Sequence, residues 1–176
     1  METADITVAT ATDVAGNLEN VPSSSSPSFE IDTDVPTILS AVTDDTMGAA
    51  GQIDEVQVTF SEALDIASLA LSDFDAGAYT VSGLNATMGN PTVTLTLDEL
   101  GSSDTDATPT ISIIGDGVND EAGNNLGTGD AGDNIVSTDG ADPAITGITS
   151  TAGDGPHNEP DVIDVNVQFS ESVTIA

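Results

Sequence analysis

The chain has 176 residues with no lysine, no arginine and no cysteine, and its 31 Asp and Glu residues give a formal net charge of −31. Without basic side chains we expect no binding to nucleic acid, because phosphate contacts need Lys and Arg, and without cysteine there are no disulfides. With 38% hydrophobic residues the chain is too apolar for a disordered polyanion, yet no apolar run approaches the roughly 20 residues that span a bilayer, so no membrane insertion is expected.

Short strands separated by Gly, Asn, Asp and Pro clusters are predicted along the chain. Apolar and polar residues alternate, as in strands with one face in a core, over residues 56–60, 92–97, 111–113 and 163–169. Further strands are expected at 37–43, 66–73, 79–84 and 133–137, with a short helical turn as an alternative near 64–69. About seven short strands in roughly 100 residues predict an all-β, immunoglobulin-like β-sandwich.

Parts of the sequence repeat at a nearly fixed spacing. Asp13-Val14-Ala15-Gly16-Asn17 recurs 107 residues later as Asp120-Glu121-Ala122-Gly123-Asn124, and Val58-Thr59-Phe60-Ser61-Glu62 recurs 109 residues later as Val167-Gln168-Phe169-Ser170-Glu171. A repeat of this length is one small domain. We therefore expect one complete repeat at 36–142, flanked by partial repeats at 1–35 and 143–176, in a fragment of a longer protein. Unpaired strand edges in the partial repeats could stay disordered, pair with each other or pair across chains.

Two motifs resemble the bacterial Ig-like repeats of large surface adhesins and RTX-type extracellular proteins. They are the segment Asp161–Glu171, which ends in Phe-Ser-Glu, and the Asp-x-Ala-Gly-Asn turn followed by a proline boundary. The resemblance spans essentially the whole chain. It implies tandem β-sandwiches in a long extracellular stalk at the cell surface, with neighbouring repeats as partners and calcium often stiffening the joints. The boundary Asp32-Thr33-Asp34 differs from Asp139-Gly140-Ala141-Asp142, so the ligand set can differ between joints.

A Ca²⁺ site at each joint is the leading hypothesis for the acidic residues. Ca²⁺ takes about six to eight oxygen ligands from carboxylates, carbonyls and water, and the acids here have almost no side-chain cation to pair with. The candidate metal ligands are Asp13, Asn17, Asp32, Asp34 and Glu62 at the first joint, and Asp120, Asn124, Asp139, Asp142 and Glu171 at the second. The alternative is that these residues are solvated turn formers, with bulk salt screening the charge as in a halophilic setting.

No catalytic arrangement is expected. His157, the one histidine, lies in a loop with Pro156 and Pro160, and a nucleophile–base pair would need a positioned serine and an orienting acid. Glycoside hydrolysis by two carboxylates is disfavoured because the chain has no Trp and one Tyr.

The sequence therefore predicts a non-catalytic spacer module of a long, acidic, extracellular adhesin, stiffened by Ca²⁺ at its joints. A possible cell-surface or glycan target would then lie elsewhere in the full protein. Three alternatives stay open: a module whose loops bind a glycan or a protein directly, an accessory domain of a secreted hydrolase, and a subunit of a surface layer or filament.

Overall fold

The computed structural model describes residues 2–5, 15, 28–115, 117–153, 155–158 and 160–175, and within them the fold is all-β, as predicted. One antiparallel sheet has the strand order β3-β4-β7-β6, formed by Ile38–Asp44, Glu55–Phe60, Thr92–Leu97 and Val81–Ala86. A second has the order β11-β8-β5, formed by Asn134–Val136, Thr110–Ile113 and Phe74–Asp75.

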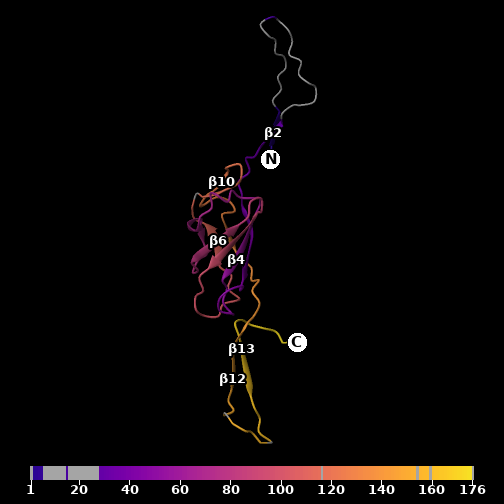
Figure 1. The fold of residues 1–176 in the computed structure, drawn as a ribbon, viewed down its shortest axis with the longest axis vertical. Helices are drawn as coiled ribbons and strands as arrows, with labels where there is room; N and C mark the ends of the chain where they lie inside the picture. Colours follow the sequence, from indigo (N-terminus) through magenta and orange to yellow (C-terminus); the bar gives the residue numbers. More distant parts are fainter. Residues whose placement is uncertain are drawn as a thin grey trace.

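Three two-stranded pairs make up the remaining sheets of the described residues. β9 (Val118–Asn119) and β10 (Asn125–Leu126) form a short hairpin on the body. β1 (Glu2–Asp5) pairs with β2 (Ser28–Ile31), and β12 (Ile145–Ser150) pairs with β13 (Val165–Phe169). β2 and the β12–β13 hairpin extend from opposite ends of the body that β3 to β11 form (Figure 1). The division of the chain into domains at 1–35, 36–142 and 143–176 stays a prediction.

The hydrophobic core lies between the two sheets of the body, where their inward faces form one cluster. The alternation predicted for 56–60, 92–97 and 111–113 is confirmed, since the apolar member of each pair is buried and its neighbours are more exposed. Phe60 is 1% exposed at the end of β4. Full burial of a side chain of this size is worth about 1.5–3 kcal/mol, so the aliphatic faces of β4, β7 and β8 supply much of the driving force.

The strand expected at 66–73 is wrong. Residues 66–68 form a turn, a 3₁₀ helix (η1) spans Leu71–Asp73, and β5 begins only at Phe74. The cause is side-chain hydrogen bonding to the backbone: Asp65 Oδ1 accepts from the Ala67 N–H at 3.0 Å, and Asp73 Oδ2 accepts from the Ala70 N–H at 2.8 Å. Such local bonds compete with a strand ladder and favour turns.

Buried carboxylates of the body are satisfied by backbone N–H groups rather than by cations. Asp54 accepts from the N–H groups of Thr46 and Met47, and Asp133 accepts from the N–H of Gly129. A buried polar group without a partner would cost about 1–3 kcal/mol. Among the described residues, no buried side-chain oxygen or nitrogen lacks a partner, which explains how a chain without Lys or Arg can bury acids at all.

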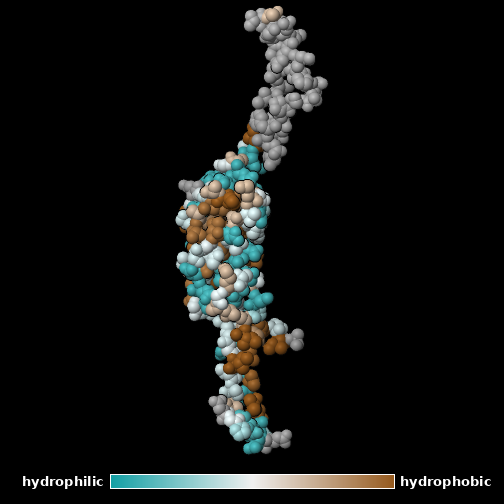
Figure 2. All heavy atoms as spheres, in the orientation of Figure 1, coloured by the Kyte–Doolittle hydropathy of each residue, from teal (hydrophilic) through white to brown (hydrophobic). Residues whose placement is uncertain are grey.

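The C-terminal hairpin does not bury the apolar face that its alternation predicts. Ile145, Ile148 and Val165 are 58%, 67% and 64% exposed, and apolar side chains run along this hairpin in Figure 2. The predicted strand at 163–169 is shorter in the structure, because β13 begins at Val165. Alternation correctly indicates which face is apolar, but no second sheet formed by the described residues covers that face.

Candidate metal centre

Three acidic side chains from distant parts of the chain meet at the end of the body where β3 begins and β4 ends. Asp32 lies in the segment that enters β3, Glu62 follows β4, and Asp120 lies in the turn between β9 and β10. One carboxylate oxygen from each lies within 4.8 Å of the other two. Oxygens that share one Ca²⁺ lie no more than about 5 Å apart, twice the usual Ca–O distance of about 2.4 Å. The three acids therefore have the separation that a single calcium ion requires.

Asp120 is the fixed member of the group. It is 2% exposed, and its Oδ1 and Oδ2 each accept a 2.7 Å hydrogen bond from Asn124, one from the backbone N–H and one from the side-chain Nδ2. The same Nδ2 donates to the Asp32 carbonyl at 3.2 Å. Because a carboxylate has about four lone-pair sites, Asp120 can hold these bonds and still bind a cation. Asn124 thereby ties the incoming segment to the 120–124 turn.

The electrostatics of this group favour a cation. Burial raises the pKa of Glu62, and the negative charges of Asp120, Asp32 and Asp34 raise it further. Asp34 stays close because its N–H donates to Asp32 Oδ1 at 3.2 Å, which closes a turn. With no Lys or Arg in the sequence, no such side chain can neutralise this repulsion. Asp32, Asp34 and Glu62 also line an open groove of about 600 Å³, through which an ion could reach the acids.

The predicted grouping of Asp120 and Asn124 with the second joint is wrong. Both residues lie beside Asp32 at the first joint, because the turn between β9 and β10 folds back towards the segment that enters β3. Asp13 and Asn17 lie outside the described residues. Their parts in a metal site stay predictions.

The acids predicted for the second joint are not gathered in the same way. Within the described part of the chain, the group of Asp32, Glu62 and Asp120 is the one whose oxygens meet, and Asp139, Asp142 and Glu171 form no comparable group. Asp139 instead accepts from the Ala141 N–H at 3.1 Å, as a turn former does. In the repeat, Asp139 and Glu171 occupy the places of Asp32 and Glu62.

One residue at this end of the body was not among the predicted site residues. Ser61 lines the groove, and its Oγ accepts from the Thr37 N–H at 3.0 Å, which fixes the backbone just before Glu62. The signal that could have found it is the repeat itself, since Ser170 occupies the same place in the second Phe-Ser-Glu segment.

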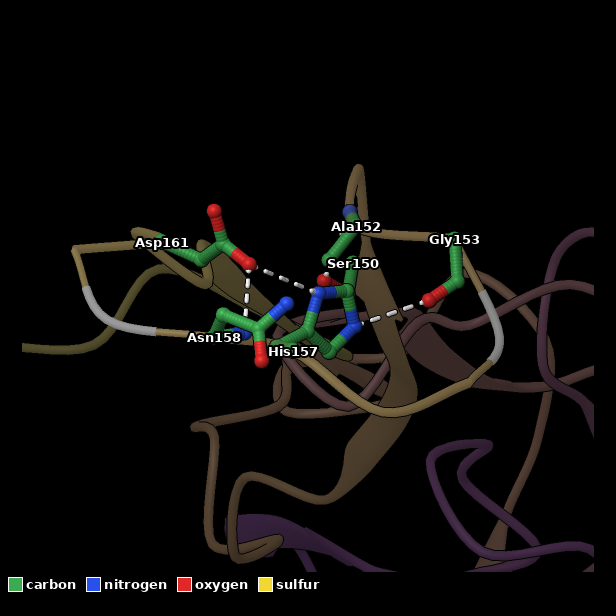
Figure 3. A network of polar contacts seen from close by, with 6 residues as sticks. All are labelled: Ser150, Ala152, Gly153, His157, Asn158 and Asp161. Carbon is green, nitrogen blue, oxygen red and sulfur yellow. Dashed lines mark hydrogen bonds and ion pairs between the residues drawn. The ribbon is translucent and has the colours of Figure 1, made fainter.

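His157 lies far from this group, in the loop between β12 and β13 (Figure 3). Its Nε2 lies 2.9 Å from the Gly153 carbonyl, and its Nδ1 lies 3.9 Å from Asp161 Oδ2, which also accepts from the Asn158 N–H at 2.7 Å. These contacts close the exposed loop upon itself. That His157 has no catalytic role stays a prediction.

Known proteins offer limited comparisons. No protein-family profile matches the chain. Over 136 residues it is 37% identical to an outer cell wall protein of Brevibacillus brevis, a match that covers 76% of this chain and 13% of that protein. The N-terminal part of the bacterial S-layer protein SbsC matches 66% of this chain and 26% of its own, with 20% identity and a TM-score of 0.43. The chain thus spans a small part of each relative. No helix in the described residues has the length and hydropathy to cross a membrane.

Proposed function

We propose that this chain is a non-catalytic structural module of a cell-surface protein, in which a Ca²⁺ ion fixes the segment entering the sandwich. The 37% identity to an outer cell wall protein supports the surface location. The antiparallel body with its aliphatic core supports a mechanical role. The observation that carries the calcium part is the convergence of Asp32, Glu62 and Asp120 from three separate segments.

Calcium would act by replacing repulsion with shared coordination. Asp32 belongs to the segment that leads from β2 to β3, whereas Glu62 and Asp120 belong to the body. An ion held by all three would cross-link that segment to the body and set the direction in which the preceding residues leave it. Without the ion, neighbouring like charges oppose the same arrangement. The module would then be a rigid spacer when calcium is bound and would bend at residues 32–37 when it is removed.

A thermal melt followed by circular dichroism tests this function. The protein in EDTA, at constant ionic strength, is titrated with CaCl₂ to a few millimolar. A ligand that binds only the native state stabilises it by about 2.7 kcal/mol at 100 times its Kd, so a saturable rise in Tm is expected. NaCl added to the same ionic strength gives the baseline.

Two variants locate the response. Glu62→Gln removes one proposed ligand and keeps its shape, and the calcium-dependent rise in Tm should shift to at least about 10-fold higher calcium, since one lost charged ligand is worth about 1.4 kcal/mol or more. Asp98→Asn, at an exposed acid after β7 at the opposite end of the sheet, should respond like the parent. Absence of any rise beyond the NaCl baseline would overturn the calcium site, and equal responses in both variants would place it elsewhere.

Two structural settings fit this module. The motif resemblance favours a spacer in an adhesin stalk, and the identity to an outer cell wall protein favours a subunit of the layer that covers the cell. Electron microscopy of the full-length protein would separate them, because a stalk gives isolated rods and a layer gives a regular two-dimensional array.

A further inference from the structure

The base of the C-terminal hairpin contacts one end of the body through a pair of hydroxyl groups. Thr105, in the loop between β7 and β8, is 0% exposed, and its Oγ1 donates to Ser170 Oγ at 2.7 Å. Ser170 follows β13, and the same Oγ accepts from the N–H of Ala144, just before β12, at 2.9 Å. Because a serine hydroxyl has two acceptor sites, Ser170 can bond the body and the start of the hairpin at the same time.

Gly51, in the loop between β3 and β4, packs its backbone directly against the hairpin. It is buried, and its φ of +95° lies in the region that favours glycine. A Cβ at this position would lie 3.2 Å from both Ser170 Cβ and Thr146 Cγ2, which is closer than carbon atoms pack at their optimal separation. A larger residue would therefore push the hairpin away, so Gly51 allows the two surfaces to meet.

The segment that connects the body to the hairpin leaves little rotational freedom. Ala141 is 7% exposed and belongs to the core cluster of the body, and Ala144 is already hydrogen-bonded to Ser170. Between them lie Asp142 and Pro143, and the proline ring fixes its φ at about −65°. Few backbone rotations can therefore change the direction of the hairpin.

Two acids beside this contact are bound within the body itself. Asp45 Oδ2 accepts from the Gly51 N–H at 2.6 Å. Asp104 Oδ1 accepts from the Ile53 N–H at 2.9 Å, and its Oδ2 accepts from the Tyr79 hydroxyl at 2.6 Å. These carboxylates hold the two loops in place, while hydroxyl groups, carbon atoms and backbone make the contact with the hairpin. Such a contact needs no counter-ion.

We propose that the end of the body formed by Gly51 and Thr105 is a docking surface for the base of the β12–β13 hairpin, and that it holds the hairpin in one orientation without a metal ion. The hydroxyl pair fixes the direction, and the glycine permits the close approach. The two ends of the body would then behave differently. Residues 32–37 would bend or stiffen with calcium, whereas the hairpin would keep its direction at every calcium concentration.

Distances between two spin labels test this orientation, because the chain has no cysteine of its own. Gln57→Cys in β4 and Thr149→Cys in β12 are both exposed positions, and each carries one nitroxide in the full chain. Pulsed electron paramagnetic resonance measures the distribution of distances between them. In EDTA the parent pair should give a single narrow peak, and millimolar CaCl₂ should leave that peak unchanged.

Three variants of this labelled chain locate the contact. Thr105→Val and Ser170→Ala each remove one hydroxyl of the pair, and each should cause the loss of the narrow peak in favour of a broad distribution. Because the two hydroxyls bond each other, the double variant should be no broader than Ser170→Ala alone. Thr108→Val, at an exposed threonine of the same loop, is the matched control and should keep the narrow peak.

Urea denaturation separates docking from folding, since Ser170→Ala changes the hairpin side of the contact and should leave the urea midpoint of the body unchanged. Four results would each overturn the proposal: a broad distribution in the parent in EDTA, a peak that narrows or moves when calcium is added, a narrow peak retained in Thr105→Val or Ser170→Ala, or equal broadening by Thr108→Val. The parent and its variants are compared in EDTA, so failure of the proposed calcium site would change none of these comparisons.

Discussion

Ser61 and Thr37 hold each other through two hydrogen bonds: the Ser61 N–H donates to the Thr37 carbonyl at 2.9 Å, and the Thr37 N–H donates to Ser61 Oγ at 3.0 Å. Ser170 and Ala144 repeat this arrangement at 2.8 Å and 2.9 Å. The serine of each Phe-Ser-Glu segment thus hydrogen-bonds the end of one strand to the residue just before the strand that pairs with it. The repeated motif therefore has a structural role.

Ser61→Ala should destabilise the body by about 1 kcal/mol, because it removes the side-chain hydrogen bond to the Thr37 N–H. Urea denaturation followed by circular dichroism measures the change as a lower midpoint with an unchanged slope. Ser102→Ala, at an exposed loop serine, should leave the midpoint within about 0.5 kcal/mol of the parent. Equal losses in the two variants would show that the Oγ bond does not contribute.

Replacing Phe60 and Phe169, which occupy equivalent positions in the repeat, should have unequal effects. Phe60 is almost completely buried, so Phe60→Ala should cost about 3–5 kcal/mol. Phe169 is half-buried on the hairpin, so Phe169→Ala should change the unfolding of the body by less than about 1 kcal/mol. Tyr79, the one tyrosine and a core residue of the body, provides a fluorescence probe of that unfolding. A large loss in Phe169→Ala at dilute, monomeric concentration would mean that the hairpin supports the core.

Several parts of the fold could be predicted from the sequence because alternation records which face of a strand meets the core. Val56, Val58 and Phe60 in β4 show this directly, as all three are buried. The segment 66–73 could not be predicted in this way, because its apolar residues fit a strand while Asp65 and Asp73 bond the local backbone. Competition between these two effects depends on geometry that residue types alone do not specify.

The meeting of Asp32 and Glu62 was foreseeable for a similar reason, because both follow strands that end at the same end of the body. That these acids bind a metal stays a prediction. The position of Asp120 could not be inferred from its place before the second boundary. That position depends on how the turn between β9 and β10 folds back towards Asp32. The hydrogen bond from the Asn124 side chain to the Asp32 carbonyl shows this fold in the structure.

Tyr79 should resist ionisation well above the ordinary range of a tyrosine. Burial raises its pKa, as do the 2.6 Å hydrogen bond that its hydroxyl donates to Asp104 and the charges of Asp104 and Asp106. Because the folded pKa lies above the unfolded value of about 10, the stability associated with the protonated hydroxyl is fully present below pH 10 and is lost as the pH rises further. Absorbance at 295 nm should therefore report tyrosinate only as circular dichroism reports unfolding.

Tyr79→Phe provides the matching mutation. It deprives Asp104 Oδ2 of its donor while Oδ1 keeps the Ile53 N–H at 2.9 Å. The free energy of unfolding should fall by about 1.5–3 kcal/mol at neutral pH, as for hydrogen bonds to charged groups. Ionisation of Tyr79 near pH 10 in a still-folded parent protein, or a Tyr79→Phe variant as stable as the parent, would show that this bond is weak in solution.

Glu62→Gln should stabilise the protein in EDTA at pH 7, which reverses its expected effect in calcium. Burial and the charges of Asp120, Asp32 and Asp34 raise the folded pKa of Glu62 above its ordinary value of 4.5. The folded state therefore holds the proton more tightly than the unfolded state, and the stability that this proton contributes is present below pH 4.5 and is lost as the pH rises through the folded pKa. Removing the charge should raise the free energy of unfolding by up to about 1 kcal/mol at pH 7, the limit for a partly exposed group, and by almost nothing at pH 3.5.

Urea midpoints at the two pH values measure this difference, with Asp98→Asn as the control. A variant that is less stable than the parent at pH 7 in EDTA would mean that the Glu62 carboxylate has a favourable partner even without metal, and that repulsion among these acids is not what calcium relieves.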